Sequence, residues 1–224
     1  MGKIIVIEGL DGCGKSTQLE ILGERLQKSG YCCRTVSFPN YNSPACEPVK
    51  MYLGGEFGSN PDDVNAYAAS TFYAIDRFAS FKTDWEEFYK TDGIIVCGRY
   101  VTSNAVHQCS KLPLSEWEKF SDWLYDFEYN KIGIPKPDAV LFLSMPPQMS
   151  EKLLMTRYDG DGEKKDIHEK DIEYQIKCRE AASFSARHNG WRIIDCTDGE
   201  KLRSIDDISD EIFGLVSSII KGEE

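Results

Sequence analysis

The chain has 224 residues, 41% of them hydrophobic, so we expect one folded domain over residues 1–224. A formal net charge of −11 argues against general nucleic-acid binding, which needs a basic surface. No apolar run reaches the roughly 18 residues that predict a membrane span. An acidic protein that handles anions must therefore concentrate its few cations at one place.

The eight cysteines include no C-x-x-C pair and no Cys/His spacing typical of a metal site. The first residues lack the charged, apolar and small-residue regions of a secretory signal. Together these features predict reduced thiols and a cytoplasmic location.

Five short apolar stretches predict β-strands. They lie at residues 3–8, 32–38, 93–97, 138–144 and 192–196. Because successive residues are apolar, we expect the strands to be buried on both faces, as parallel strands are. Amphipathic helical segments separate them, which indicates an α/β three-layer fold with a five-stranded parallel sheet flanked by helices.

A phosphate-binding loop follows the first strand. The segment "GLDGCGKS", residues 9–16, fits G-x-x-x-x-G-K-[ST], and a helix over residues 15–28 follows, closed by Gly30. Glycines let backbone N–H groups converge on phosphate oxygens, Lys15 reaches the β- and γ-phosphates, and Ser16 is the predicted Mg²⁺ ligand. The predicted ATP-binding residues are Gly9, Gly12, Cys13, Gly14, Lys15, Ser16 and Thr17.

Two motifs that would change this interpretation are incomplete. The segment "NKIG" at 130–133 has Gly133 where a guanine-reading motif has aspartate. The segment "DGDG" at 159–162 follows no predicted strand, and Lys164 and Lys170 replace the turn glycine and terminal glutamate of a calcium loop. A GTPase and a calcium site are therefore disfavoured.

Two arginines are candidates for a second substrate. A helix is predicted from Asn60, as N-cap, through Pro61, and on it Tyr73 and Arg77 share a face. A ring beside a guanidinium can stack on a base and bind its carbonyl, although Tyr73 can equally be a core aromatic. Arg99 follows the third strand, at the sheet edge where ligands bind, so it is a phosphate-binding candidate or a surface ion pair.

The last third of the chain adds three further expectations. A helix is predicted over residues 113–130, with an apolar stripe for core or subunit packing: Trp117, Phe120, Trp123, Leu124 and Phe127. The polar, glycine-bearing segment 157–171 is predicted to be a mobile loop. His107 and His168 permit a metal site, but a solvated or hydrogen-bonded role is the more common one.

Taken in order, these segments resemble the thymidylate kinase family, P-loop enzymes that transfer a phosphoryl group from ATP to dTMP. The resemblance runs from about residue 3 to 220. It rests on "IEGLDGCGKST", "FP" at 38–39, "YAIDRF" at 73–78, "RYVTSNA" at 99–105, "PDAVLFL" at 137–143 and "DIHEKD" at 166–171. It implies a homodimer that uses Mg²⁺ with ATP.

The resemblance also implies a role for each matching position. Asp11 stands where the family binds the nucleotide 3′-hydroxyl, and Arg99 where it holds the acceptor phosphate. A lid at about 157–170 would close over ATP. The implied dTMP-binding residues are Asp11, Tyr73, Arg77, Arg99, Ser103 and Asn104, and the implied catalytic residues are Lys15, Arg99 and Arg157.

The chain departs from the family pattern at the end of the third strand. The family has D-R-[YH] there, and Gly98 replaces the aspartate that helps to organise Mg²⁺ or its waters. Glu8 or Asp11 can take over part of this role. The departure leaves open a nucleotide-binding protein with weak or no kinase activity, and the pattern also leaves open a kinase for another nucleotide such as dUMP.

A second departure concerns the family's catalytic arginine. Gly12 occupies the position of this arginine in the phosphate loop, and Ile167 occupies it in the lid. An arginine that stabilises the transferring phosphoryl group accelerates transfer by orders of magnitude. Of the nearby cations Arg157, Lys164 and Lys165, we select Arg157 as the replacement.

Overall fold

The computed structural model describes residues 1–157, 168 and 172–223, apart from the side chains of residues 147, 156, 157 and 172. Among the helices of this part of the chain, none is long and apolar enough to cross a membrane. The lid predicted at 157–170, including Lys164, Lys165 and Ile167, lies outside it except for the helical backbone at 157 and for His168.

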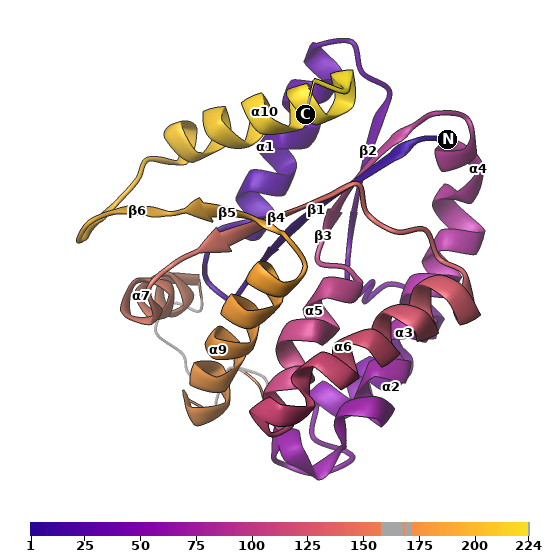
Figure 1. Cartoon of the computed structure of the whole chain (residues 1–224), viewed down its shortest axis with the longest axis vertical. Coiled ribbons are helices and arrows are strands. Elements are labelled where there is room, and N and C mark those ends of the chain that lie inside the picture. Colours follow the sequence, from indigo (N-terminus) through magenta and orange to yellow (C-terminus); the bar gives the residue numbers. More distant parts are fainter. Residues whose placement is uncertain (158–167, 169–171, 224) are drawn as a thin grey trace.

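A five-stranded parallel sheet forms the centre of the molecule (Figure 1), as the sequence predicted. Its order is β2-β3-β1-β4-β5, so β2 and β3 lie on one side of β1, and β4 and β5 lie on the other. The strands are β1 (Lys3–Gly9), β2 (Cys33–Ser37), β3 (Ile94–Gly98), β4 (Ala139–Ser144) and β5 (Arg192–Asp195). A short antiparallel pair, β6 (Thr197–Asp198) and β7 (Lys201–Leu202), follows β5.

Burial on both faces holds only for the three inner strands. All five residues of β3 are buried, as are the last six of β1, whereas Arg34 and Thr35 of β2 and Ile193 of β5 are exposed. The prediction is therefore wrong for β2 and β5. These strands are the two edges of the sheet, where helices cover less of each face.

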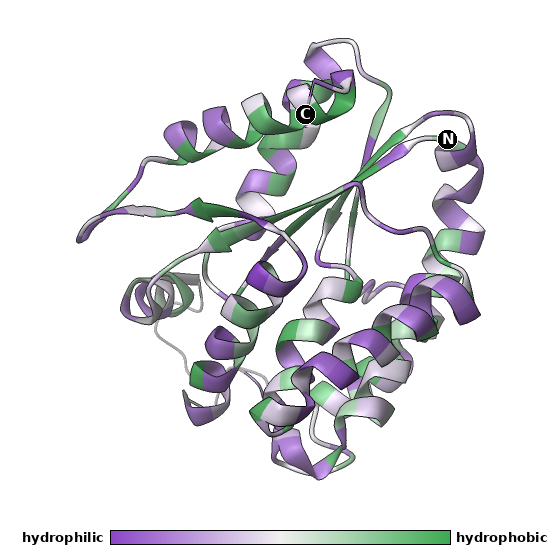
Figure 2. Cartoon of the chain, in the orientation of Figure 1, coloured by the Kyte–Doolittle hydropathy of each residue, from purple (hydrophilic) through white to green (hydrophobic). Residues whose placement is uncertain are grey.

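Helices cover both faces of the sheet, which gives the expected three layers. The two faces of β1 alternate: Ile5 and Ile7 pack with α1 (Lys15–Lys28) and α10 (Ile205–Lys221), and Ile4 and Val6 pack into the opposite core. That second core is covered by α3 (Ala66–Ser80), α5 (Val101–His107), α6 (Trp117–Tyr125) and α9 (Ile172–His188). Figure 2 shows hydrophobic residues concentrated in the central strands and hydrophilic ones on the outer helix faces.

The helix expected from Asn60 begins later than the sequence indicated. Asn60 and Asp63 form a capping box, but this box caps the start of a separate 3₁₀ turn at Pro61–Asp63. Val64 is extended, and α3 then begins at Ala66 with the side chain of Asn65 as its cap. Two successive capping signals therefore start two elements. The helix continues as a π turn at Phe81–Trp85 and as α4 (Glu86–Lys90).

The helix expected over 113–130 is similarly divided. A 3₁₀ turn at Leu114–Glu116 precedes α6, and a π turn at Asp126–Ile132 follows it. Trp117, Phe120 and Leu124 of the predicted stripe are buried in the core, while Trp123 and Phe127 are half-buried and stacked at 5.1 Å. Among the described residues the other α-helices are α2 (Glu47–Leu53) and α7 (Pro147–Arg157).

Candidate active site

The phosphate-binding loop connects β1 to α1 in the predicted position. Gly12 and Gly14 have φ angles of 77° and 86°, the left-handed region that glycine adopts without strain. A Cβ atom on Gly9 would lie 2.6 Å from the Cys13 sulfur. Gly9 thus lies beneath the loop and shapes it, and it is absent from the residues that line the cavity described below.

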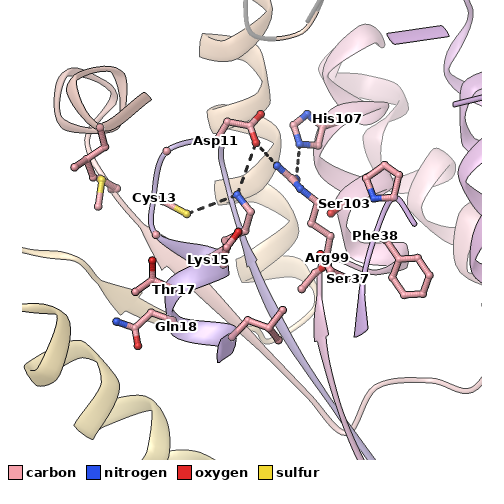
Figure 3. Close-up of a pocket in the computed structure, with 18 of the residues that line it drawn as sticks. Asp11, Cys13, Lys15, Thr17, Gln18, Ser37, Phe38, Arg99, Ser103 and His107 are labelled. Atoms are coloured by element: carbon pink, nitrogen blue, oxygen red, sulfur yellow. Dashed lines mark hydrogen bonds and ion pairs between the residues drawn. The ribbon is translucent and has the colours of Figure 1, made fainter. Parts of the chain in front are cut away.

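The Lys15 side chain is bonded to other atoms of the same loop. Its Nζ donates a hydrogen bond to the Leu10 carbonyl at 2.6 Å and lies 3.8 Å from an oxygen of Asp11 (Figure 3). The side chain is 12% exposed. Both partners are loop atoms that a phosphate can replace, so this position is compatible with the predicted role of the lysine toward the β- and γ-phosphates.

The position of Gly12 excludes a larger side chain. A Cβ atom there would lie 2.4 Å from the Ser150 carbonyl oxygen and 2.8 Å from a carbon of Leu154, both in α7. An arginine at position 12 would force α7 away from the loop. Any arginine that serves the transferring phosphoryl group must therefore come from another segment.

Arg99 follows β3 with a φ of 68°, an uncommon value for a residue with a side chain. Its Nη2 donates to Asp11, its Nη1 donates to His107 Nε2 at 3.0 Å, and Nη1 also lies 3.7 Å from Glu8. Burial alone would raise the pKa of Asp11, but Arg99 and Lys15 outweigh it and hold that pKa well below its usual value. Asp11 is therefore ionised and neutralises part of the site's positive charge.

The acceptor side of the site is built from α3 and α5. Arg77 is buried, and Glu128 holds its guanidinium in a two-point ion pair with an Nε–Oε2 distance of 2.7 Å. Arg77 Nη1 also donates to the Tyr100 carbonyl at 3.3 Å. Asn104 donates to Glu128 at 3.2 Å. One carboxylate therefore fixes two of the predicted dTMP-binding side chains.

A second buried carboxylate, Glu8 in β1, organises the junction between loop and acceptor side. One oxygen accepts from the backbone N–H of Gly9 at 2.9 Å, and the other accepts from Thr102 at 2.8 Å and Ser103 at 2.7 Å. Glu8 is 1% exposed. Three donors bind its two oxygens, and of Glu8 and Asp11 only Asp11 is among the residues that line the cavity.

One cavity of about 620 Å³ joins the two sides, a size suited to small-molecule ligands. Twelve of the predicted residues line it: Asp11, Gly12, Cys13, Gly14, Lys15, Ser16, Thr17, Tyr73, Arg77, Arg99, Ser103 and Asn104. The structure thus brings the predicted phosphate and base contacts into a single space, although their roles toward a ligand stay predictions. Arg157 ends α7, and its side chain lies outside the described part.

The cavity also contains residues that the sequence analysis did not assign. Gln108 is fully buried in its wall, and neither its amide oxygen nor its amide nitrogen has a partner among the described residues. His107 and His168 line the same space. Gln108 follows Asn104 by four residues, so the two share a helix face, and this spacing could have indicated from the sequence that Gln108 faces the site. His168 is buried, His107 is half-buried, and both rings are hydrogen-bonded, which is one of the two roles expected for them.

Position 98, where the family has aspartate, is closely packed. A Cβ atom on Gly98 would lie 2.8 Å from a methyl carbon of Leu19 and 3.3 Å from the Ser37 hydroxyl oxygen. The tip of Leu19 therefore occupies the space that a side chain at 98 would need. A carboxylate at this position requires a shift of the leucine.

The donor set suits Mg²⁺ that arrives with a nucleotide. Among the described residues, no group of three or more His, Cys, Asp or Glu side chains can hold a metal by itself. Ser16, at the start of α1, lines the cavity beside Lys15. Mg²⁺ is typically bound by one or two protein oxygens together with substrate phosphates and water, and Ser16 can supply such an oxygen.

A phosphate-binding loop at the end of the central strand, beside a buried arginine and a polar pocket in one cavity, is typical of a P-loop kinase for small phosphorylated acceptors. The family model for thymidylate kinase matches residues 7–208. A thymidylate kinase from Mycobacterium tuberculosis is 31% identical over 77% of this chain and 80% of its own length. One from Plasmodium falciparum is 29% identical over 97% and 91% of the two chains.

The chain therefore belongs to the thymidylate kinase family, and it is a nucleoside monophosphate kinase, a phosphotransferase. A solved structure of a thymidylate kinase from Candida albicans has the same fold. Its TM-score is 0.68 at 21% identity, over 97% of this chain and 92% of the other.

Proposed function

We propose that the chain transfers the γ-phosphoryl group of ATP to dTMP and releases dTDP and ADP. Membership of the thymidylate kinase family supports the acceptor. The observation that carries the proposal is the single cavity lined by Lys15, Arg99 and Tyr73, which joins a triphosphate cradle to a pocket for a base. Transfer is direct and in line, so positioning and charge neutralisation supply the catalysis.

The chain's own residues then have distinct roles. Backbone N–H groups of residues 12–17 bind the ATP phosphates, and Lys15 leaves Leu10 to bind the β- and γ-phosphates. Mg²⁺, held by Ser16 and the phosphates, neutralises charge on the transferring group. Arg99 binds the acceptor phosphate, Asp11 accepts from the 3′-hydroxyl, and the remaining acceptor contacts are Tyr73, Arg77, Ser103 and Asn104.

A lid at about 157–170 is part of the proposal, and Arg157 is its cation for the transferring phosphoryl group. Support comes from α7, because Leu154 lies against the phosphate loop at Gly12 and Arg157 follows three residues later on the same helix. The packing at Gly12 also prevents that loop from supplying the arginine itself. Closure would exclude water, so that transfer to dTMP outcompetes hydrolysis.

We further propose one domain over residues 1–224 that forms a homodimer in the cytoplasm. One hydrophobic core contains both β1 and α10, near the two ends of the chain, which supports one domain.

On α3, Tyr67, Ile75 and Phe78 are 36%, 50% and 41% exposed and share a face by spacing, which supports a second copy as partner. Light scattering should give twice the mass of one chain. The substitution Ile75→Asp should lower the measured mass toward that of a single chain.

A specific observation favours a second candidate, a nucleotide-binding protein with weak or no kinase activity. Position 98 lacks a carboxylate and Leu19 fills its space. A third candidate keeps the chemistry and changes the acceptor to a nucleotide such as dUMP, because one methyl group gives only about 1–3 kcal/mol of discrimination.

One experiment separates these candidates. ADP production is measured with ATP, Mg²⁺ and each of dTMP, dUMP, dGMP and thymidine, for the natural chain and for Gly98→Asp. We expect strong turnover with dTMP in the natural chain. Activity only in Gly98→Asp would favour the weak kinase, preference for dUMP would change the acceptor, and no activity in either variant would contradict the kinase proposal.

A further inference from the structure

The guanidinium of Arg99 is held by two carboxylates and by one neutral ring. Asp11 binds Nη2 and Glu8 lies near Nη1, both on the side of the phosphate loop. His107, on α5, binds Nη1 from the other side at 3.0 Å (Figure 3). An arginine is only a donor, so His107 Nε2 must be the acceptor and cannot carry a proton.

The other contacts of His107 fix this tautomer. The proton must lie on Nδ1, which is 3.6 Å from the Cys178 sulfur on α9. Cys178 in turn donates to the Ser110 hydroxyl at 3.4 Å, and Ser110 donates to the His107 carbonyl at 2.9 Å. Burial first, and Arg99 second, hold the pKa of His107 well below its usual value, so the ring is neutral.

The ring is also fixed in orientation. It is stacked on His168 with centroids 5.7 Å apart and an interplanar angle of 14°, and on Tyr174 at 6.3 Å. With Nη1 at His107 and Nη2 at Asp11, the plane of the guanidinium is set at two points. The second Nη1–H has only Glu8 near it, at 3.7 Å, whereas the Nε–H and the second Nη2–H of Arg99 have no partner within the described residues and are the donors left for a phosphate.

We propose that His107 is a positioning residue of the acceptor site: its neutral imidazole holds Nη1 of Arg99 while Asp11 holds Nη2, so that the guanidinium is fixed and presents its remaining N–H groups to the phosphate of the acceptor. The inference rests on the proposed function, because it assumes that Arg99 binds that phosphate. Without His107, two carboxylates alone would hold the guanidinium. A third carboxylate could accept the same hydrogen bond from Arg99, but its negative charge would repel a phosphate dianion. A neutral ring adds no charge to the site.

The test compares dTMP with thymidine, which lacks only the phosphate. Affinities of both ligands are measured by calorimetry for the natural chain and for His107→Phe, His107→Gln and Arg99→Gln. Phenylalanine keeps an aromatic ring beside His168 and Tyr174 but removes the acceptor. Glutamine places an amide oxygen near the position of Nε2. Thermal unfolding checks that each variant is folded.

We expect His107→Phe to lower the ratio of dTMP to thymidine affinity about fivefold or more, because a hydrogen bond to a charged group is involved. Thymidine affinity should change less than about twofold, and His107→Gln should restore most of the ratio. An unchanged ratio in His107→Phe, with a collapsed ratio in Arg99→Gln, would overturn the inference and leave the proposed function intact. An unchanged ratio in Arg99→Gln would remove Arg99 as the phosphate-binding residue and overturn the inference with it.

Discussion

The two sides of the cavity are built in different ways. The phosphate-binding side is a continuous segment, residues 9–17, and its backbone N–H groups and single lysine are the proposed phosphate contacts. The acceptor side combines side chains from β1, α3, α5 and the π turn after α6, held by the buried carboxylates Glu8 and Glu128. The first can be identified as a motif, and the second depends on partners that are far apart in the sequence.

The largest effect is expected on the phosphate-binding side. Lys15→Ala should lower kcat with dTMP by about 10³-fold, because it removes a charge aimed at the transferring phosphoryl group. A coupled assay of ADP production measures it. Lys28→Ala, on the same helix but exposed and paired with Glu24, is the matched control and should retain full activity. Loss of less than tenfold in Lys15→Ala would show that this side is not the donor site.

Replacement of Glu128 should affect stability as well as binding. Glu128→Gln leaves the buried Arg77 without its counter-charge and should lower the free energy of unfolding by about 3 kcal/mol. Urea unfolding measures it, and Glu24→Gln in an exposed pair is the control. The double variant Arg77→Met, Glu128→Met should recover part of the stability while dTMP binding stays weak. Equal instability of both Glu variants would argue against this pair as the support of the acceptor side.

These two sites show what could be predicted from the sequence. The phosphate loop, all five strands within two residues, and Arg99 at the end of β3 were identified, because each depends on local pattern. Arg77 was identified from its spacing to Tyr73, and Asp11 and Asn104 by resemblance, and the structure places all three in the cavity. The carboxylates that hold them could not be predicted, because Glu128 is 51 residues from Arg77 and lies in a π turn.

The errors in the sequence analysis have equally physical causes. Successive apolar residues in β2 and β5 indicated burial on both faces, but a strand's place in the sheet order decides that, and both are edge strands. Asn60 carried a valid capping signal, but a second one at Asn65 follows it and starts α3. Gln108 was passed over because a buried, unpartnered amide is recognisable only once its neighbours are known.

Gln108 tests the acceptor side in a further way, because its replacement should raise the stability of the fold and weaken the binding of dTMP. Its buried amide lacks hydrogen-bond partners among the described residues, and such a group costs about 1–3 kcal/mol. Gln108→Leu should therefore raise the free energy of unfolding by about 1 kcal/mol and weaken dTMP binding about tenfold. Urea unfolding and calorimetry measure the two effects. Unchanged dTMP affinity would show that the amide does not contact the acceptor.

The smallest effect concerns pH and again belongs to the acceptor side. His168 is buried, its Nε2 is hydrogen-bonded to the Tyr52 hydroxyl at 2.8 Å, and it lies near Lys111, whose Nζ donates to the same hydroxyl at 2.7 Å. Burial first, and Lys111 second, lower the pKa of His168 from 6.5 to about 3. Between these values the unfolded chain binds a proton that the folded chain does not, so stability is complete above pH 6.5 and is lost as the pH falls.

From pH 7.0 to 5.5 this histidine should therefore account for a loss of about 1 kcal/mol in the free energy of unfolding. His168→Gln should remove that part of the pH dependence, measured by urea unfolding at both values. Asp11 contributes nothing in this window, because its depressed pKa places its titration at lower pH. Identical pH dependence in both chains would mean that His168 is solvated rather than held neutral by burial. In that case the acceptor side would be more open to water than its hydrogen bonds indicate, and the contrast with the phosphate-binding side would be weaker.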